Sequence, residues 1–172
     1  MDEPNANRPD SSISFRLAMR RMASTISIIS TTDDSGQRFG MVATSVSSVS
    51  MDPPTLLICV NRAASIHAPL LQQRRFCVNV LTPEQRCLVA AFSGHLKGED
   101  RFTLGRWTAH ERWGLPSLEA AQANIACTVE KCIEMGTHSV LIASVICTQV
   151  ADAVDPLIYV DGQLSTVAAL AA

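Results

Sequence analysis

The spacing of the strand-like segments constrains the fold of this chain more than any other feature. Runs rich in β-branched and small residues cover positions 25–31, 39–50 and 55–60, and only short turns at 33–36 and 52–54 separate them. A parallel pair of strands needs a crossover of a dozen or more residues, so turns this short permit only antiparallel neighbours. We therefore predict an antiparallel, mainly β chain in which these three runs form a meander.

The rest of the chain continues this pattern with a few helices inserted. Further strands are predicted at 75–81, 125–133, 138–150 and 157–160, and helices at 12–22, 63–71 and 82–94. The first helix places Phe15, Ala18, Met19 and Met22 on one face. Thr82, Pro83 and Gln85 are typical of a helix start. Residues 97–114 are irregular and are predicted to form a long loop. Six or seven strands with two or three inserted helices favour an antiparallel β-barrel.

Composition and charge limit the domain organisation and exclude several partners. The 172 residues are 47% hydrophobic and only 17% charged, enough for one core. We expect a flexible N-terminus at 1–11, a single domain at 12–163 and a C-terminal tail at 164–172. A net charge of -2 without a basic cluster argues against nucleic-acid binding. No uncharged run is apolar enough for a membrane span, so we expect a cytoplasmic protein without membrane contact.

Cysteine and glycine patterns exclude several common sites. The six cysteines lie in apolar runs, which predicts buried thiols rather than disulfides, and no CxxC or HExxH pattern indicates a metal site. Cys127 and Cys132 lie five positions apart on a predicted strand, which places them on opposite faces. The eight glycines form no GxGxxG, Walker or GxSxG motif.

One predicted strand is unusually rich in hydroxyl groups. Five of the seven residues from 44 to 50 are Ser or Thr. A buried hydroxyl without a partner costs about 1–3 kcal/mol, so these side chains either face water or face a polar ligand. A flat ring system with carbonyls and ring nitrogens would suit such a surface, and a half-exposed strand with a solvated face is the plain alternative.

Two further clusters carry anion-binding chemistry. Asn61, Arg62 and Ser65 lie where a strand ends and a helix begins, and helix N-terminal N–H groups favour phosphate. A simple helix cap would explain the same residues without any ligand. Lys97 and Arg101 add two cations further along the chain. The two tryptophans in the following segment, Trp107 and Trp113, are expected to pack in a dimer or loop core.

The three clusters together resemble the flavin reductase-like family, the small NAD(P)H:flavin oxidoreductase components of two-component flavin monooxygenases. The strings that carry the resemblance are GMVATSVSSVSMDPPTLLICVNRAASIHAPL, RFCVNVLTPEQRCLVAAFSG, DRF, GTHSVLIASV and PLIY, which together run over most of the chain. The resemblance implies a split antiparallel β-barrel of the FMN-binding type and a homodimer. It also implies FMN or FAD as the flavin and NADH or NADPH as the co-substrate.

The resemblance assigns roles residue by residue. It implies that the flavin ring lies against Thr44, Ser45, Val46 and Ser47, with Ser50 nearby. Around the ribityl chain and the phosphate it implies Cys59, Asn61, Arg62, Ser65, Phe76, Asn79, Arg101 and Phe102. His138 matches the histidine that positions the nicotinamide, although Thr137 stands where the family has an aspartate. No metal site is implied.

Three functions remain open from the sequence. The first is a reductase that supplies reduced flavin to a partner monooxygenase. The second keeps its flavin and passes electrons to another acceptor, such as a cob(II)alamin-type corrinoid. The third is a non-catalytic flavin-binding protein. In all three, a dimer face and a flavin surface at 39–51 and 135–151 would account for the low charge.

Overall fold

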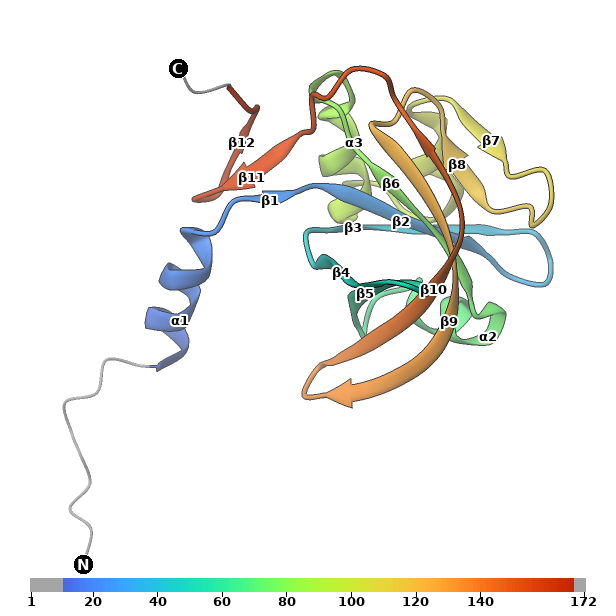
Figure 1. The fold of residues 1–172 in the computed structure, drawn as a ribbon, viewed down its shortest axis with the longest axis horizontal. Coiled ribbons are helices and arrows are strands. Elements are labelled where there is room, and N and C mark those ends of the chain that lie inside the picture. The colour runs from blue at the N-terminus through green and yellow to red at the C-terminus, as the bar shows by residue number, and fades with distance from the viewer. Residues whose placement is uncertain (1–10, 169–172) are drawn as a thin grey trace, which may run out of the picture.

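A seven-stranded antiparallel sheet forms the body of the protein (Figure 1). The structure is a computed structural model and describes residues 11–168. Residues 1–10 of the predicted flexible N-terminus (1–11) and residues 169–172 of the predicted tail lie outside the described residues. The strand order is β3-β2-β6-β9-β10-β5-β4. The strands are β2 (Ser27–Thr32), β3 (Arg38–Ala43), β4 (Val46–Met51), β5 (Pro54–Asn61), β6 (Arg75–Val80), β9 (Ala123–Met135) and β10 (His138–Val150). The prediction of a mainly β, antiparallel chain with a few helices is confirmed.

The predicted three-stranded meander is wrong. The predicted strand at 39–50 is two strands, β3 and β4, which lie at opposite edges of the sheet. β3 pairs with β2, and β4 pairs with β5. The chain crosses between the edges at Thr44 and Ser45, and the N–H of Cys59 on β5 donates to the carbonyl of Ser45 at 3.3 Å. No glycine or proline marks this break, so the sequence shows one continuous run.

The inner strands β9 and β10 are long and contribute several residues to the main hydrophobic core. They form a hairpin around Gly136 and Thr137, and β10 has the bounds predicted for it. The main core cluster lies on one face of the sheet and includes Ile58, Leu70, Phe76, Cys127 and Leu141. Helix α2 (His67–Gln73) contributes Leu70 to this cluster, and its position fixes the loop that follows β5.

A second core cluster is built from short helical turns between β6 and β8. These are η1 (Pro83–Gln85), α3 (Cys87–Ala90), η2 (Ala91–His95) and η3 (Gly98–Thr103). The predicted start at Thr82 is confirmed, because its N–H donates to the side-chain oxygen of Gln85 at 3.1 Å. Residues 97–114 are not one long loop. They contain η3 and strand β7 (Trp107–Ala109), which pairs with β8 (Pro116–Leu118).

Helix α1 and a small sheet lie apart from the body (Figure 1). Helix α1 (Ser11–Arg20) leads into β1 (Ser24–Thr25), which pairs with β11 (Ile158–Val160), and β11 pairs with β12 (Gln163–Ser165). Arg20 holds α1 to the β11–β12 turn, since its guanidinium donates to the carbonyl of Asp161 at 2.8 Å. Strand β12 extends two residues into the predicted C-terminal tail.

The cysteines are free thiols, but they are not all buried. Cys77 and Cys127 are buried, whereas Cys87 and Cys132 are exposed. The prediction of six buried thiols is wrong for those two, because Cys132 lies on the solvent-facing half of β9 and Cys87 opens a short helix at the surface. Within residues 11–168, no helix has the length and apolar character of a membrane span, and no three His, Cys, Asp or Glu side chains are grouped as metal ligands.

Candidate functional site

A cationic pocket lies between β3, η3 and the loop that precedes α2. It has a volume of about 460 Å³. Its lining comprises Gln37, Arg38, Phe39, Ser65, Gly94, Lys97, Gly98 and Arg101. The glycines Gly94 and Gly98 have φ angles of 111° and 53°, which side-chain-bearing residues rarely adopt. The pocket therefore brings together Ser65, Lys97 and Arg101, which the sequence placed in separate clusters.

Arg101 is fixed in this pocket by three acceptors. Its Nε donates to the carbonyl of Leu96 at 2.9 Å, and its Nη1 donates to the carbonyl of Gly40 at 2.8 Å. The same Nη1 lies 3.4 Å from the hydroxyl of Ser65. A guanidinium has five N–H donors, so the Arg101 side chain still has free donors for an anion. Its position is set by the hydrogen bond to the backbone of β3.

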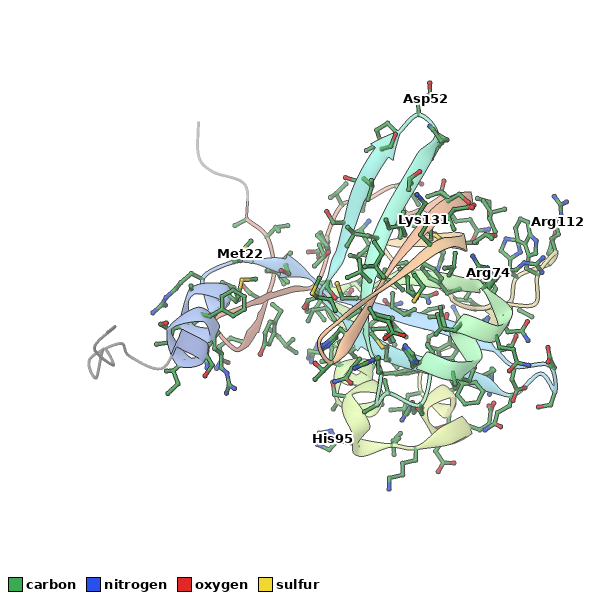
Figure 2. All side chains as sticks on the ribbon, turned by 90° about the horizontal axis from the view of Figure 1, so that it is seen from below. Met22, Asp52, Arg74, His95, Arg112 and Lys131 are labelled. Carbon is green, nitrogen blue, oxygen red and sulfur yellow. The ribbon has the colours of Figure 1, made fainter. Side chains whose placement is uncertain are left out.

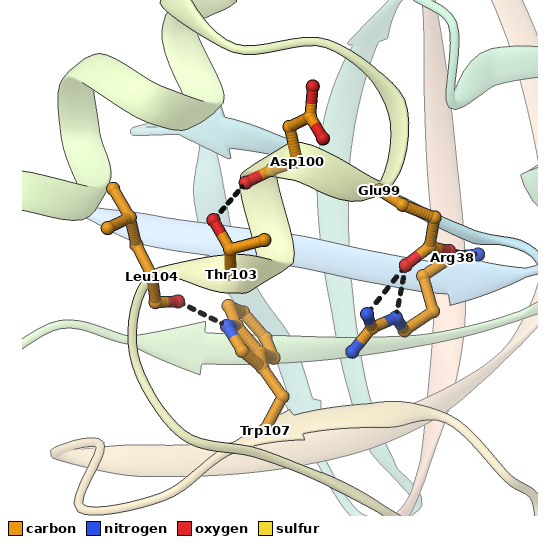
Figure 3. Close-up of polar contacts among 6 residues, drawn as sticks. All are labelled: Arg38, Glu99, Asp100, Thr103, Leu104 and Trp107. Carbon is orange, nitrogen blue, oxygen red and sulfur yellow. Dashed lines mark hydrogen bonds and ion pairs between the residues drawn. The ribbon is translucent and has the colours of Figure 1, made fainter.

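Arg38 and Glu99 join β3 to η3 at the rim of the pocket (Figure 3). The N–H of Arg38 donates to one carboxylate oxygen of Glu99 at 2.7 Å, and its guanidinium contacts the other at 2.6 Å. Partial burial alone would raise the pKa of Glu99, but the hydrogen bonds and charge of Arg38 outweigh it and lower that pKa. Because Arg38 is neutralised here, Lys97 and Arg101 supply the net positive charge.

An aromatic cluster beneath η3 supports the pocket from below. The ring of Phe102 lies 5.2 Å from that of Phe92 and 5.0 Å from that of Trp107. Phe102 is thus buried and contacts Arg38 across its face at 4.6 Å, which makes it a support for the pocket rather than part of its surface. The expectation that Trp107 packs in a loop core is confirmed (Figure 3).

The hydroxyl-rich strand divides its side chains between two surfaces. Thr44, Ser45 and Ser47 are exposed where the chain crosses from β3 to β4. Val46 and Ser50 instead line an apolar groove of about 270 Å³ on β4, β5 and β10. Cys59 is half-buried, and its backbone holds Ser45 through two contacts. The crossing therefore joins Ser45, which the resemblance places against the ring, to Cys59, which it places near the ribityl chain, while Val46 and Ser50 face the groove.

Asn61, Arg62 and His138 gather at one strand end. Asn61 on β5 lies directly opposite His138 on β10. Arg62 donates to the carboxylate of Glu134 at 3.0 Å and to the carbonyl of Gly136 at 2.6 Å, so it holds the β9–β10 turn.

The exposed His138 ring is oriented by its own neighbour in the chain. Its Nδ1 lies 2.9 Å from the hydroxyl of Thr137. The ring is thereby held at the start of β10, with Arg62 fixing the turn before it. We therefore regard Arg62 as a positioning residue for His138 rather than as part of the cationic pocket.

Two of the predicted site residues do not reach any accessible surface. Phe76 is fully buried in the main core cluster. Asn79 is also fully buried, and its amide donates to the carbonyl of Ile28 and accepts from the N–H of Leu118, at 2.9 and 2.8 Å. Its polar atoms are used within the fold, because a buried amide must be paired. Sequence reasoning also missed Arg38 and Gly40, which no motif marks.

These features define a class of protein: a mainly β, cofactor-binding protein in which an edge strand leads from an anion pocket to an exposed polar segment. The chain belongs to the flavin reductase like domain family, whose model matches residues 19–168. It is similar to the reductase component of a FADH(2)-dependent resorcinol hydroxylase from Rhizobium sp. strain MTP-10005, with 41% identity over 87% of this chain and 83% of the relative.

Further relatives agree with this membership. The chain is 37% identical to FMN reductase (NADH) RutF of Pseudomonas syringae, over 87% of this chain and 83% of the relative. Among solved structures, it resembles the flavin reductase of styrene monooxygenase from Pseudomonas putida S12. That match has a TM-score of 0.82 and 28% identity over 92% of this chain and 99% of the other.

Proposed function

We propose that this chain is an NADH-dependent flavin reductase that supplies reduced FMN or FAD to a separate monooxygenase. Family membership and the names of its relatives support this function. The single observation that carries it is the fixed guanidinium of Arg101, which links the backbone of β3 to the hydroxyl of Ser65 inside a cationic pocket. That donor set fits the phosphate of a flavin nucleotide.

The residues of this chain would hold the two ends of the flavin at opposite ends of β3. Arg101, Ser65 and Lys97 bind the phosphate beside Gly40. Thr44 and Ser45 contact the ring, with Ser47 and Cys59 beside them. Four residues of extended chain separate Gly40 from Thr44, a span of about 13 Å. This length suits a ligand with a phosphate at one end and a flat ring at the other.

The chain itself contributes geometry rather than redox chemistry. The bound flavin supplies the hydride acceptor that no side chain can provide. His138, which Thr137 orients, positions the nicotinamide of NADH or NADPH near the exposed Thr44–Ser45 crossing. Fixing donor and acceptor in one orientation is the main way in which a protein accelerates such a transfer.

Finer features of the proposal concern the assembly. The seven-stranded sheet belongs to a split β-barrel of the FMN-binding type in a single domain at 12–163. The functional unit is a homodimer in the cytoplasm. Support comes from the apolar groove on β4 and β5 and from the exposed Phe15 and Met19 on α1, since a second copy would remove such surfaces from water.

Titration of the purified protein with FMN and FAD, followed by addition of NADH or NADPH, tests the proposal. We expect saturable flavin binding and rapid oxidation of NADH. If the protein binds neither flavin and does not oxidise NADH, the proposed function is refuted. A bound flavin that stays oxidised in stopped-flow mixing would instead indicate a non-catalytic flavin carrier. Faster NADH oxidation with a corrinoid than with free flavin would indicate the alternative acceptor.

A further inference from the structure

A histidine and a cysteine form a close pair outside the residues of the candidate flavin site. The Nε2 atom of His110 lies 3.0 Å from the sulfur of Cys147. His110 belongs to the loop between β7 and β8, which two backbone hydrogen bonds close: His110 N–H to Leu115 and Gly114 N–H to His110, both at 2.8 Å. Cys147 lies on β10, nine residues beyond His138, a distance of about 30 Å along an extended strand.

The surroundings of His110 determine which of its nitrogens carries the proton. The N–H of Arg112 lies 3.3 Å from Nδ1, so Nδ1 accepts and Nε2 carries the hydrogen that faces the sulfur. The indole of Trp113 stacks on the imidazole at 4.6 Å and holds the ring in this orientation. The sulfur therefore accepts a hydrogen bond from an imidazole N–H that the loop holds in place, the kind of neighbour that reactive cysteines have.

The His110 side of the pair faces a cavity that opens to solvent. Cys147 is half-buried, and His110 lines a cavity of about 420 Å³ together with polar groups of Ser117 and Gln149. Figure 2 shows Arg112 at the outer end of its loop, away from the β4–β5 hairpin that carries Asp52. None of the residues that line this cavity is among those that line the cationic pocket.

The other cysteines provide internal comparisons. Burial raises the pKa of Cys77 to about 11 and that of Cys127 to about 12, so both stay protonated. Cys87 and Cys132 are more exposed than Cys147. Within residues 11–168, neither of these two sulfurs is hydrogen-bonded to a histidine. Reactivity governed by exposure alone would favour Cys87 and Cys132, whereas reactivity governed by the paired donor would favour Cys147.

We infer that the His110–Cys147 pair is a site of thiol oxidation by hydrogen peroxide. The Cys147 thiolate attacks one peroxide oxygen, an S–O bond forms and the O–O bond breaks. The leaving hydroxide takes a proton from solvent to give water, so sulfur loses two electrons and becomes a sulfenic acid.

Cys77, across β9 from Cys147, cannot form a disulfide with it. Cys77 and Cys147 both lie opposite Ala126, on the two sides of β9, so their Cα atoms are about 10 Å apart. A disulfide requires less than about 7 Å between Cα atoms, so the two cannot be joined. Hydrogen peroxide forms when reduced flavin reacts with dioxygen. This source of peroxide rests on the proposed function, whereas the assignment of the His110–Cys147 site does not depend on it.

Peroxide added to the full-length protein, without flavin or nicotinamide, tests the inference. Dimedone traps sulfenic acids, and peptide mass mapping gives the rate of labelling at each cysteine. We expect Cys147 to be labelled at least about fivefold faster than Cys87 or Cys132. Faster labelling of either exposed cysteine would overturn the inference, and the absence of flavin keeps this outcome separate from any failure of the reductase activity.

Two substitutions at His110 isolate the role of the donor. His110→Phe keeps a ring for Trp113 but removes the N–H, and we expect labelling of Cys147 to fall about tenfold. His110→Gln retains an amide N–H and is expected to restore part of the rate. His95→Phe, at an exposed histidine whose ring nitrogen contacts the carbonyl of Ala90, is the matched control and should change nothing. An unchanged rate in folded His110→Phe would also overturn the inference.

Discussion

Arg101 is the residue on which the proposed flavin site most depends. Removing its guanidinium deletes charge-assisted hydrogen bonds to the phosphate and releases the carbonyl of Gly40. We expect Arg101→Ala to raise the Kd for FMN about tenfold to hundredfold, equivalent to about 1.4–2.8 kcal/mol. Flavin fluorescence titration measures this. Arg106→Ala, which breaks only the exposed ion pair with Glu119, should leave the Kd unchanged; equal effects of the two would exclude Arg101 from the site.

Gly40 allows β3 to pack closely on the aromatic cluster. A Cβ at this position would lie 2.5 Å from the ring of Phe92, which is only 4% exposed and has little room to move. We therefore expect Gly40→Ala to lower the free energy of unfolding by about 1–3 kcal/mol, measured by urea denaturation. Gly40→Ala combined with Phe92→Leu should lose less than the two single changes together. Full additivity would show that the two sites do not touch.

His138 is expected to affect the nicotinamide and not the flavin. Its ring is exposed and lies opposite Asn61 at the strand end, outside the residues that line the cationic pocket. We predict that His138→Ala raises the KM for NADH severalfold, by about 1 kcal/mol of lost binding, while the Kd for FMN stays unchanged. Steady-state kinetics with a parallel flavin titration separates the two constants. An unchanged KM would remove His138 from the nicotinamide site.

Single residues were predictable from sequence where a motif marks them, and not where packing decides their role. Ser65 could be picked out because it lies near a predicted helix start, and Arg101 because it belongs to the Arg-Phe pair of the resemblance; both line the cationic pocket. Arg62 was expected near the phosphate, and its pairing with Glu134 and Gly136 was not foreseen, because both partners are distant in sequence. Asn79 was predicted to contact the ligand, but its amide is paired with the backbone of Ile28 and Leu118. No local sequence pattern indicates these two partners.

At the scale of elements, η3 depends on its link to β3. The pKa of Glu99 is lowered in the folded protein, so the contribution of this carboxylate to stability is present above its unfolded value near 4.5 and is lost as pH falls through the folded value. We predict that wild type is more stable than Glu99→Gln at neutral pH. The difference should shrink as the pH falls below 4.5 and the carboxylate of the folded protein is protonated. Denaturation of both proteins across this range checks it; a constant difference would contradict the assignment.

Elements were predictable where turn residues or periodicity bound them. The β9–β10 hairpin and the start at Thr82 have such local signals. The break at Thr44 and Ser45 has no such local signal. The chain moves to the other edge of the sheet there because β4 pairs with β5, and this pairing is not encoded in the neighbouring residues. The prediction of one long loop at 97–114 was wrong for a related reason. Strand β7 has only three residues, and it is defined by its pairing with β8, beyond a loop that has its own side-chain contacts.

The whole molecule leaves an unusual amount of apolar surface exposed. Met51 is 79% exposed beside the groove on β4 and β5, and Phe15 on α1 is 66% exposed. Because charged residues make up only 17% of the chain, few of them are available to surround these surfaces. Exposed apolar patches of this kind are typical of protein–protein interfaces. The sequence placed Phe15 on one apolar helix face and predicted an uncharged surface at 39–51. It did not show the groove on β4 and β5, because that groove depends on which strands lie at the sheet edge.

The groove gives the last prediction, which concerns assembly. If a second copy covers β4 and β5, the protein sediments at twice the chain mass of 18.5 kDa. Met51→Glu places a charge in that apolar contact, and we expect it to weaken dimerisation at least about tenfold, measured by analytical ultracentrifugation. Val154→Glu changes an equally exposed apolar residue outside the groove and should leave the dimer intact. A monomeric wild type would mean that the low charge of the chain has another cause, while the flavin assignment, which rests on Arg101, would stand.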